Sequence, residues 1–336
     1  MNLNAWLTIL RLPNLGAQLG IARDAEALVR LHFLYAAATS GLLKTLRTPA
    51  SREEVGQRLG ARRADLLDAL LEVGVSLGEL TCDNGRYRIC GKRAAALADD
   101  RGDPLVAIVE EAVTYHGAVY RDLPARLRDG GSGDYLAGRG PMIARSSRVL
   151  EPFMREFVRQ VVASGGPIRM LEIGCGSGIY LRHAATANPQ ATGIGIDLQD
   201  DVVRPTSSRL EEWGLAERFR LLHADIRTPP PALAGPFDLI TLYNNIYYFP
   251  PGERVALLRS LHDRLTDGGV LALTTMFHSR AVAAANFDLV LRSTVGCAPM
   301  GTVDDLVAQV HDSGFGRVTT TRLMPMQPFY GIMARK

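Results

Sequence analysis

The chain has 336 residues, of which 47% are hydrophobic and 22% charged, and its formal net charge is +3. This length suffices for two domains with sizeable cores, and the composition is typical of a globular protein and not of a disordered or fibrous one. The 38 basic residues are interspersed with 35 acidic ones, so the sequence does not indicate a basic surface for nucleic acid.

No apolar run approaches the roughly 18 residues that a membrane span needs. Residues 1–6 lack the basic start of a signal peptide, so we expect a cytoplasmic protein.

A two-residue turn at Asn84-Gly85 sets Cys82 opposite Tyr87, which argues against a disulfide to Cys90. The cysteines include no Cys-x-x-Cys pair and no metal spacing: Cys82, Cys90, Cys175 and Cys297.

The first part of the chain predicts three helices followed by a hairpin. Apolar residues recur at helical spacing over 24–44. A second helix, 51–59, begins with a capping box at Ser51 and ends at Gly60, and a third covers 65–75. Residues 80–89 then read as two short strands around a type I′ turn. This order predicts a winged helix.

A winged helix usually binds DNA, but the third helix carries acids and leucines where DNA readers carry basic and amide side chains. We therefore expect no nucleic-acid partner. The segment is similar to the N-terminal dimerisation domain of small-molecule O-methyltransferases, with Gly41-Leu42-Leu43 followed by Thr48-Pro49 and Leu59-Gly60. The resemblance implies a homodimer, and these helices expose more leucine and alanine than one small domain can bury.

A further helical stretch over 104–127 is expected to be interrupted at Pro124. The resemblance implies that such helices line a substrate pocket, although its aromatic residues also fit a core or interface role. The glycine-rich loop 130–134 precedes a segment, 135–147, that could cover the pocket as a lid, followed by a helix over 148–163. The substrate-pocket candidates from this region are Tyr115, His116, Tyr120 and Tyr135.

The second part of the chain is organised around residues 168–178, Ile-Arg-Met-Leu-Glu-Ile-Gly-Cys-Gly-Ser-Gly. An apolar run before Gly174, Gly176 and Gly178 reads as a buried strand, a tight turn and a helix start. Such a unit begins an open α/β sheet, which binds ligands at the carboxyl ends of its strands. The Gly-x-Gly-x-Gly spacing, with Glu172 upstream, differs from the Gly-x-Gly-x-x-Gly of dinucleotide binders.

This pattern resembles motif I of the class I S-adenosylmethionine (SAM) dependent methyltransferases. The resemblance implies that the loop, with Glu172, Gly174, Gly176 and Gly178, packs against the methionine part and ribose of SAM. Asp197 ends the next buried strand, 19 residues beyond Gly178. A carboxylate there can accept hydrogen bonds from both ribose hydroxyls, worth about 1.5–3 kcal/mol each.

The third strand, 219–223, is followed by Asp225, which by the same resemblance takes the adenine amino group. Leu198 and Ile226 would flank the adenine ring. The remaining strands are expected over 237–243, 270–275, 315–323 and 329–334, and the last two resemble the antiparallel terminal pair of this fold. We predict an α/β protein with a Rossmann-like seven-stranded sheet over 161–336, preceded by a helical winged-helix dimerisation and lid domain over 1–160.

The chain departs from the O-methyltransferases after the fourth strand. Members that methylate phenols carry His-Asp-Trp there, with the His as general base, whereas this chain has Tyr247-Tyr248-Phe249. The same change removes the His and Asp that hold a metal in related keto-acid C-methyltransferases, so we predict no metal site. His278 follows the fifth strand and could reach the pocket, but a structural or exposed role also fits.

The remaining candidates are amides and aromatic rings. An amide orients a ligand without titrating, and an aromatic face stabilises a sulfonium cation by about 0.5–2 kcal/mol. Both asparagines also fit as turn formers at a strand end; if they are functional, proximity and alignment supply most of the rate. The catalytic candidates are Asn244, Asn245, Tyr247 and His278, and further substrate-pocket candidates are Tyr248 and Phe249.

Three functions fit these residues. The first is SAM-dependent methyl transfer to a small molecule, in secondary metabolism, by in-line attack on the sulfonium methyl; the acceptor, and whether its atom is O, N or C, stay open. In the second, SAM is the only substrate: its amino group attacks the γ carbon and methylthioadenosine leaves, as in the azetidine-2-carboxylate synthases on this fold. The third is a SAM-binding regulator without turnover.

Overall fold

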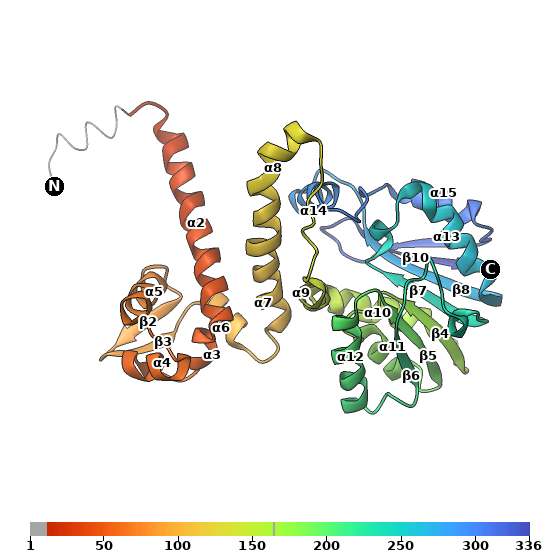
Figure 1. The fold of residues 1–336 in the computed structure, drawn as a ribbon, viewed down its shortest axis with the longest axis horizontal. Coiled ribbons are helices and arrows are strands. Elements are labelled where there is room, and N and C mark those ends of the chain that lie inside the picture. Colours follow the sequence, from red (N-terminus) through yellow and green to blue (C-terminus); the bar gives the residue numbers. More distant parts are fainter. Residues whose placement is uncertain (1–11, 164) are drawn as a thin grey trace. The chain divides into compact units, whose positions relative to one another are not determined.

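The computed structural model describes residues 12–163 and 165–336. Residues 1–11, including the 1–6 segment interpreted above, lie outside the described part. The chain forms two compact units, Met1–Thr114 and Tyr115–Lys336 (Figure 1). This division falls earlier than the boundary predicted near residue 160. The lid segment belongs with the sheet because Gly133 exchanges backbone hydrogen bonds with Ser293 (2.8 Å) and Val295 (2.9 Å). No helix within the described ranges has the length and apolar character needed to cross a membrane.

The first unit contains the predicted helices and hairpin. The first helix begins earlier than expected, at Leu15, and breaks at Gly41, whose φ of +83° suits glycine. The capping box is confirmed, since Ser51 and Glu54 exchange side-chain and backbone hydrogen bonds. The elements of the first unit are α2 (Leu15–Thr39), α3 (Leu42–Thr45), β1 (Ala50–Ser51), α4 (Arg52–Leu59), α5 (Ala64–Ser76), β2 (Leu80–Asp83), β3 (Arg86–Ile89), α6 (Lys92–Ala98) and α7 (Asp103–Glu110).

The hairpin register places Cys82 opposite Tyr87, as the turn chemistry predicts, and all four cysteines are free. The predicted interruption at Pro124 is wrong, because Pro124 lies inside α8 (Gly117–Asp129). The irregularity lies earlier, in a π-helical turn, Glu111–His116, where the wider turn accommodates an extra residue. The lid segment forms a loop, then α9 (Gly140–Ser146) and a 3-10 turn, Ser147–Leu150, before α10 (Glu151–Val161).

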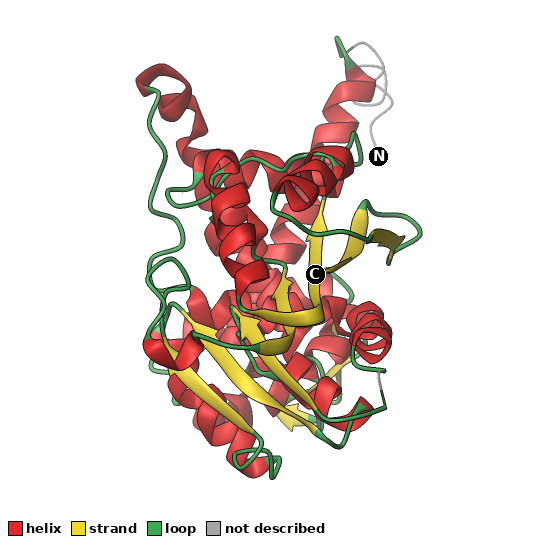
Figure 2. Ribbon diagram, turned by 90° about the vertical axis from the view of Figure 1, so that its right-hand side faces the viewer, coloured by secondary structure: helices red, strands yellow, loops and turns green. Residues whose placement is uncertain are grey.

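The second unit is built on one seven-stranded sheet, as predicted (Figure 2). The strand order is β6-β5-β4-β7-β8-β10-β9, with β10 antiparallel to both of its neighbours. The strands are β4 (Ile168–Ile173), β5 (Ala191–Asp197), β6 (Phe219–His223), β7 (Phe237–Tyr243), β8 (Leu265–Met276), β9 (Val318–Arg322) and β10 (Phe329–Arg335).

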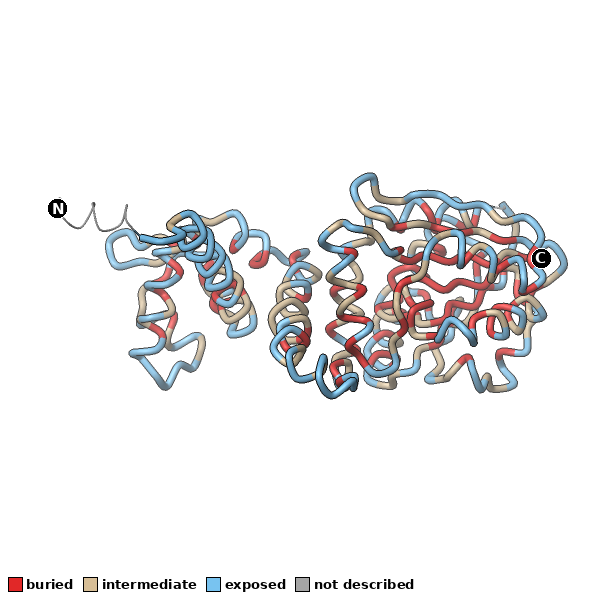
Figure 3. Tube along the Cα trace, turned by 90° about the horizontal axis from the view of Figure 1, so that it is seen from above, coloured by how far each residue is buried: buried red, intermediate tan, exposed pale blue. Residues whose placement is uncertain are grey.

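Helices cover both faces of this sheet, because alternate residues of each central strand are apolar on opposite sides. On β7, Ile240 and Leu242 pack with α13 and α15, whereas Leu239 and Tyr243 pack with α10 and α11. The strands are accordingly the most buried part of this unit (Figure 3). The helices are α11 (Ile179–Ala187), α12 (Asp200–Glu212), α13 (Pro251–Asp263), α14 (Val282–Ser293) and α15 (Val303–Asp312).

The close approach of β4 and β5 can be tested with Gly193→Ala. A Cβ at Gly193 would lie 2.1 Å from the carbonyl oxygen of Met170, so one strand must shift. We expect the free energy of unfolding in urea to fall by about 1–3 kcal/mol. Gly252→Ala is the matched control, because a Cβ there meets nothing within 4 Å and helix α13 gains a better helix former. Equal stability of the two variants would contradict this packing.

Candidate functional site

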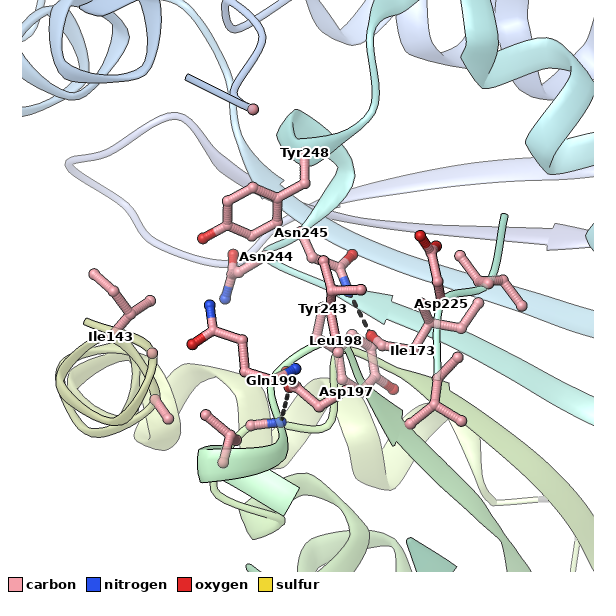
Figure 4. Close-up of a pocket in the computed structure, with 18 of the residues that line it drawn as sticks. Ile143, Ile173, Asp197, Leu198, Gln199, Asp225, Tyr243, Asn244, Asn245 and Tyr248 are labelled. Carbon is pink, nitrogen blue, oxygen red and sulfur yellow. Dashed lines mark hydrogen bonds between the residues drawn. The ribbon is translucent and has the colours of Figure 1, made fainter. Parts of the chain in front are cut away.

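A cavity of about 360 Å³ opens where the central parallel strands end. The parallel strands β4, β5, β6 and β7 bring their carboxyl ends to one edge of the sheet, and the loops that follow them line the cavity together with the lid segment (Figure 4). This is where open α/β sheets bind ligands. The predicted residues that line it are Gly174, Gly176, Asp197, Leu198, Asp225, Ile226, Asn244, Asn245, Tyr247, Tyr248 and Phe249.

The glycine loop is held in place by Asn245. Gly174 has φ +68°, and a Cβ there would lie 2.5 Å from Nδ2 of Asn245, so glycine is required for conformation and for space. The Asn245 amide donates a hydrogen bond to the carbonyl of Ile173, linking the ends of β7 and β4. Asn245 is only 7% exposed. The structure thus gives this predicted catalytic residue a positioning contact.

Gly178 does not line the cavity within the described part of the chain. It precedes the first residue of α11 with φ +72°, and a Cβ there would lie 2.8 Å from the Thr206 side chain. Thr206 in turn donates a hydrogen bond to the carbonyl of Gly176 at 2.8 Å. The structure thus gives Gly178 a supporting contact behind the loop, and its contact with the cofactor stays a prediction.

Asp197 ends β5 with its carboxylate directed into the cavity (Figure 4). Its Oδ2 accepts from the backbone N–H of Gly176 at 3.0 Å, and its Oδ1 from that of Gln199 at 3.1 Å. Burial raises the pKa of Asp197, and these N–H groups oppose the rise. Each oxygen keeps a second lone pair, so the carboxylate can still accept from a diol such as ribose.

The residues after β6 form an apolar slot with one carboxylate. Ile226 is 4% exposed, whereas Leu198 is 55% exposed, and both line the cavity. Arg227 donates to both oxygens of Asp225 at 2.9 Å, and this hydrogen bonding lowers the pKa of that carboxyl. The carboxylate therefore stays ionised at the edge of the slot. With Asp197 and the glycine loop, the slot fits the adenosine part of SAM.

Glu172 lies behind the glycine loop and is fully buried. Neither carboxylate oxygen has a hydrogen-bond partner among residues 12–163 and 165–336. Burial, followed by the charge of Asp197, holds the pKa of Glu172 well above its usual value. Tyr180 and Tyr243 line the cavity beside it, and sequence reasoning missed both. A hydroxyl-bearing ring directly after the glycine loop was the available signal for Tyr180.

The other end of the cavity is neutral and aromatic. Asn244 has φ +58°, its backbone N–H donates to the Thr274 carbonyl at 2.8 Å, and its Nδ2 is buried without a partner in the described structure. The amides of Asn244 and Gln199 and the Tyr248 hydroxyl point toward one region beside Ile143 (Figure 4). Gln199 also lines the cavity and is a third residue that sequence reasoning missed.

No histidine, lysine or glutamate is present among the described residues that line the cavity. His278 is exposed, and its backbone N–H donates to Gly301 at 3.1 Å. It is not among the described lining residues, because the chain after β8 turns toward Gly301, and its catalytic role stays a prediction without support from the cavity. No group of three or more His, Cys, Asp or Glu in the described ranges could hold a metal ion.

The aromatic residues of the π-helical turn, α8 and the lid segment belong to the scaffold, because they contact one another, α14 or Thr294 directly after it. Tyr115 and Thr294 share a hydrogen bond of 2.9 Å, and Tyr120 donates to Asn286 at 3.0 Å. Tyr135 donates to Asp122 at 3.1 Å. His116 lies 3.4 Å from the Asn286 amide. None of the four predicted pocket residues, Tyr115, His116, Tyr120 and Tyr135, is among the described residues lining the cavity. Leu136, Ile143 and Ala144 of the lid segment line it instead.

The buried carboxyl can be tested with Glu172→Gln. Since the folded pKa lies above that of the unfolded chain, the folded state binds more protons between the two values, and the wild-type free energy of unfolding falls as pH rises. Glu172→Gln should therefore gain stability over wild type as pH rises from about 4.3, the usual glutamate pKa. Urea unfolding at several pH values measures this difference. Glu211→Gln, at an exposed position on α12, is the control, and a pH-independent gain for Glu172→Gln would contradict the assignment.

Known proteins share these features in sequence. A family model described as a methyltransferase domain matches residues 171–271. The chain is 26% identical over 258 residues to L-tyrosine C(3)-methyltransferase of Streptomyces lavendulae, covering 70% of this chain and 69% of the relative. It is 28% identical over 156 residues to the ubiquinone biosynthesis O-methyltransferase of Psychrobacter arcticus, covering 44% and 59%.

Solved structures share the fold along nearly the whole chain. The mitomycin 7-O-methyltransferase matches with a TM-score of 0.76 at 18% identity, covering 96% of this chain and 98% of that one. Human N-acetylserotonin methyltransferase, solved in complex with SAM, matches with a TM-score of 0.75 at 16% identity, covering 97% and 99%. With a methyltransferase domain around the glycine loop and a cavity that fits adenosine, the chain is similar in sequence and fold to SAM-dependent methyltransferases, and SAM is its cofactor.

Proposed function

We propose that the enzyme transfers the methyl group of SAM to a small, uncharged acceptor molecule of secondary metabolism. The observation that carries this proposal is that one cavity joins two chemically different ends. The glycine loop, Asp197 and Asp225 form the end that fits adenosine. Amide and aromatic side chains form the other, beneath the lid segment. An acceptor at the second end would lie next to the cofactor.

Bound SAM supplies an electrophilic methyl group on a sulfonium sulfur. The residues of this chain hold and align the two reactants, because the described lining has no His, Lys or Glu and its two aspartates lie at the end that fits adenosine. Asn244 contributes a buried amide donor whose backbone is fixed in the left-handed conformation. Tyr247 is held edge-on between Tyr248 and Phe287, at centroid distances of 4.8 and 5.3 Å.

The lining favours a neutral acceptor with an apolar or aromatic body. Ile143, Tyr248, Phe249 and Val295 provide apolar contact area. Arg227 is the one cation among the described lining residues, and its guanidinium is engaged by Asp225, so an anionic acceptor lacks a partner. The relatives named for L-tyrosine and mitomycin support a small-molecule acceptor.

Neither the SAM cyclase nor the SAM-binding regulator without turnover gains support from the structure. The relatives named above are methyltransferases, which favours turnover over a purely regulatory role.

The proposal is tested by incubating the protein with SAM alone and with pools of small aromatic acceptors. We expect S-adenosylhomocysteine only when an acceptor is added, and no methylthioadenosine above the unaided decay of SAM, both measured by mass spectrometry. Asp197→Ala should stay folded but lose measurable SAM binding in calorimetry, because it removes two charge-assisted hydrogen bonds. Methylthioadenosine formed with SAM alone would establish the cyclase instead, and unchanged affinity of the variant would refute the assignment of Asp197.

We also propose that the first unit is a winged helix used for homodimerisation in the cytoplasm, with no nucleic-acid partner. Several large apolar side chains of α2 and α5 are exposed, among them Ile21, Leu28 and Leu66 at 69%, 56% and 57%. Burying such side chains against a second copy gives about 25 cal/mol per Å² of apolar surface.

The dimer is tested by light scattering. The wild type should give a mass near twice 36.5 kDa at micromolar concentration. Leu28→Lys combined with Ile21→Lys should shift it toward 36.5 kDa, because charges replace apolar contacts. Met326→Lys, at an apolar position of the second unit that is even more exposed (85%), is the control and should not change the mass. A monomeric wild type would overturn the proposal.

A further inference from the structure

Two side-chain amides, from Gln199 and Asn244, face the same part of the cavity. Gln199 lies directly before α12, where its backbone N–H donates to Asp197, and Asn244 directly follows β7. The nitrogen atoms of both amides are directed toward one region beside Ile143 (Figure 4). Two amide NH2 groups cannot hydrogen-bond to each other, because their nitrogens donate and do not accept. The arrangement therefore lacks a hydrogen-bond acceptor between them.

The surrounding chain gives both amides this orientation. The amide oxygen of Gln199 is turned against the lid segment, since a Cβ at Gly140 would collide with it, and the nitrogen is left on the cavity side. The backbone of Asn244 has φ +58°, and its N–H donates to the Thr274 carbonyl at 2.8 Å. Nδ2 of Asn244 is buried without a partner in the described structure. Because a buried donor without a partner destabilises a fold, this donor indicates a ligand that accepts from it.

The acceptor end of the cavity carries no charged side chain in the described structure. The lid segment and residues 295–296 line it without acidic or basic groups. On neighbouring elements, Asp200 is paired with Arg204, and Glu172 is buried behind the glycine loop. The charged residues of the described lining, all at the end that fits adenosine, are Asp197, Asp225 and Arg227. Its other titratable residues are tyrosines, at 180, 243, 247 and 248.

We infer that the Gln199 and Asn244 amides bind an acidic oxygen of the acceptor, in a phenol or an enol, and hold it as its oxyanion. The inference rests on the proposed function, because it concerns the molecule that takes the methyl group. The acceptor is uncharged in solution and releases its proton to the solvent on binding, so no side chain has to act as a base. Hydrogen bonds to a charged oxygen are stronger than those to a neutral one, and two amide donors therefore favour the ionised form.

An oxyanion also suits the transfer of the methyl group. Its negative charge would lie next to the positive sulfonium of bound SAM, between buried rings such as Tyr247 and Phe249, where water does not weaken the attraction.

Other acceptor classes fit the amide pair less well. A carboxylate is charged before it binds, and the guanidinium of Arg227 is already engaged by Asp225. An ammonium would bring more N–H donors to a pair of donors. The class of acceptor that fits is thus a weak oxygen acid.

The test uses 4-nitrophenol, whose phenol and phenolate forms absorb at different wavelengths. The protein is first saturated with S-adenosylhomocysteine, which lacks the sulfonium charge, and then titrated with the probe at several pH values. The bound probe should ionise at a proton concentration roughly tenfold higher than the free probe, the size expected for hydrogen bonds to a charged group. Nitrobenzene, which has the ring without the acidic oxygen, reports by calorimetry how well the pocket accepts the ring itself.

Two variants each remove one amide. Methionine in Gln199→Met matches the length of glutamine, and glycine in Asn244→Gly tolerates the left-handed backbone. Each should abolish most of the shift in ionisation, while the affinities for nitrobenzene and S-adenosylhomocysteine stay within about twofold. Gln190→Met, at an exposed glutamine outside the described lining, is the matched control and should keep the wild-type shift. Tyr248→Phe should keep it too, because the amides hold the charge.

Each other outcome overturns the inference. A wild type that binds 4-nitrophenol in its neutral form, or binds neither probe, has no oxyanion site at the amide pair. Loss of the shift in Tyr248→Phe but not in the amide variants would assign the ionisation to the tyrosine. Equally weakened binding of nitrobenzene in the amide variants would mean that the amides only shape the pocket.

Failure of the proposed function gives a different result. A wild type that does not bind S-adenosylhomocysteine in calorimetry refutes both the proposed function and this inference, whereas normal binding of S-adenosylhomocysteine without ionisation of the probe refutes the inference alone.

Discussion

The cavity depends on the hydrogen bond from the Asn245 side chain to the carbonyl of Ile173. This bond joins the ends of two adjacent parallel strands, β4 and β7, at the edge where their loops diverge. It requires Gly174, because any Cβ there would occupy the space of the Asn245 amide. The glycine loop on one side and the Asn244 turn on the other are therefore fixed relative to each other. Both reactants of a methyl transfer would be aligned by that single link.

The charged and the neutral side chains of the cavity lie on different sides of this hydrogen bond. Asp197, Asp225 and the buried Glu172 lie on the side of the glycine loop, and backbone N–H groups or Arg227 satisfy the first two. Glu172 remains without a partner in the described residues, which costs stability in the free protein. Unsatisfied polar groups of this kind are typical of binding sites, where local stability is lost in favour of function.

The opposite side of the cavity is neutral, and this decides what the enzyme can do for its acceptor. Amides and tyrosine hydroxyls orient a molecule without changing their charge near neutral pH. The lid segment lines this side of the cavity. An isolated β-bridge between Gly133 and Thr294 holds the start of that segment in place. Since the described lining has no His, Lys or Glu and its aspartates lie on the side of the glycine loop, its residues contribute alignment and exclusion of water to the transfer.

The sequence alone was sufficient for the features that depend on local chain chemistry. The capping box at Ser51 and the turn at Asn84-Gly85 follow from local residue preferences, and apolar runs indicate the single strands, whereas the seven-stranded sheet was implied by the family resemblance. Asp197 and Asp225 were also predictable, because the ends of parallel strands meet at one edge and the motif spacing marks those ends.

Only the tertiary structure decided which way other side chains face. His278 follows strand β8 as predicted, yet its side chain is exposed. Tyr115 lies in the predicted helical stretch, yet it packs against Tyr135 and Met142 of the lid segment. Tyr180, Tyr243 and Gln199 carry no motif, and they reach the cavity because α11, β7 and α12 bring distant segments together. Periodicity fixes the face of an element, but whether a cavity or a neighbouring helix lies opposite that face depends on packing between elements, which no local pattern encodes.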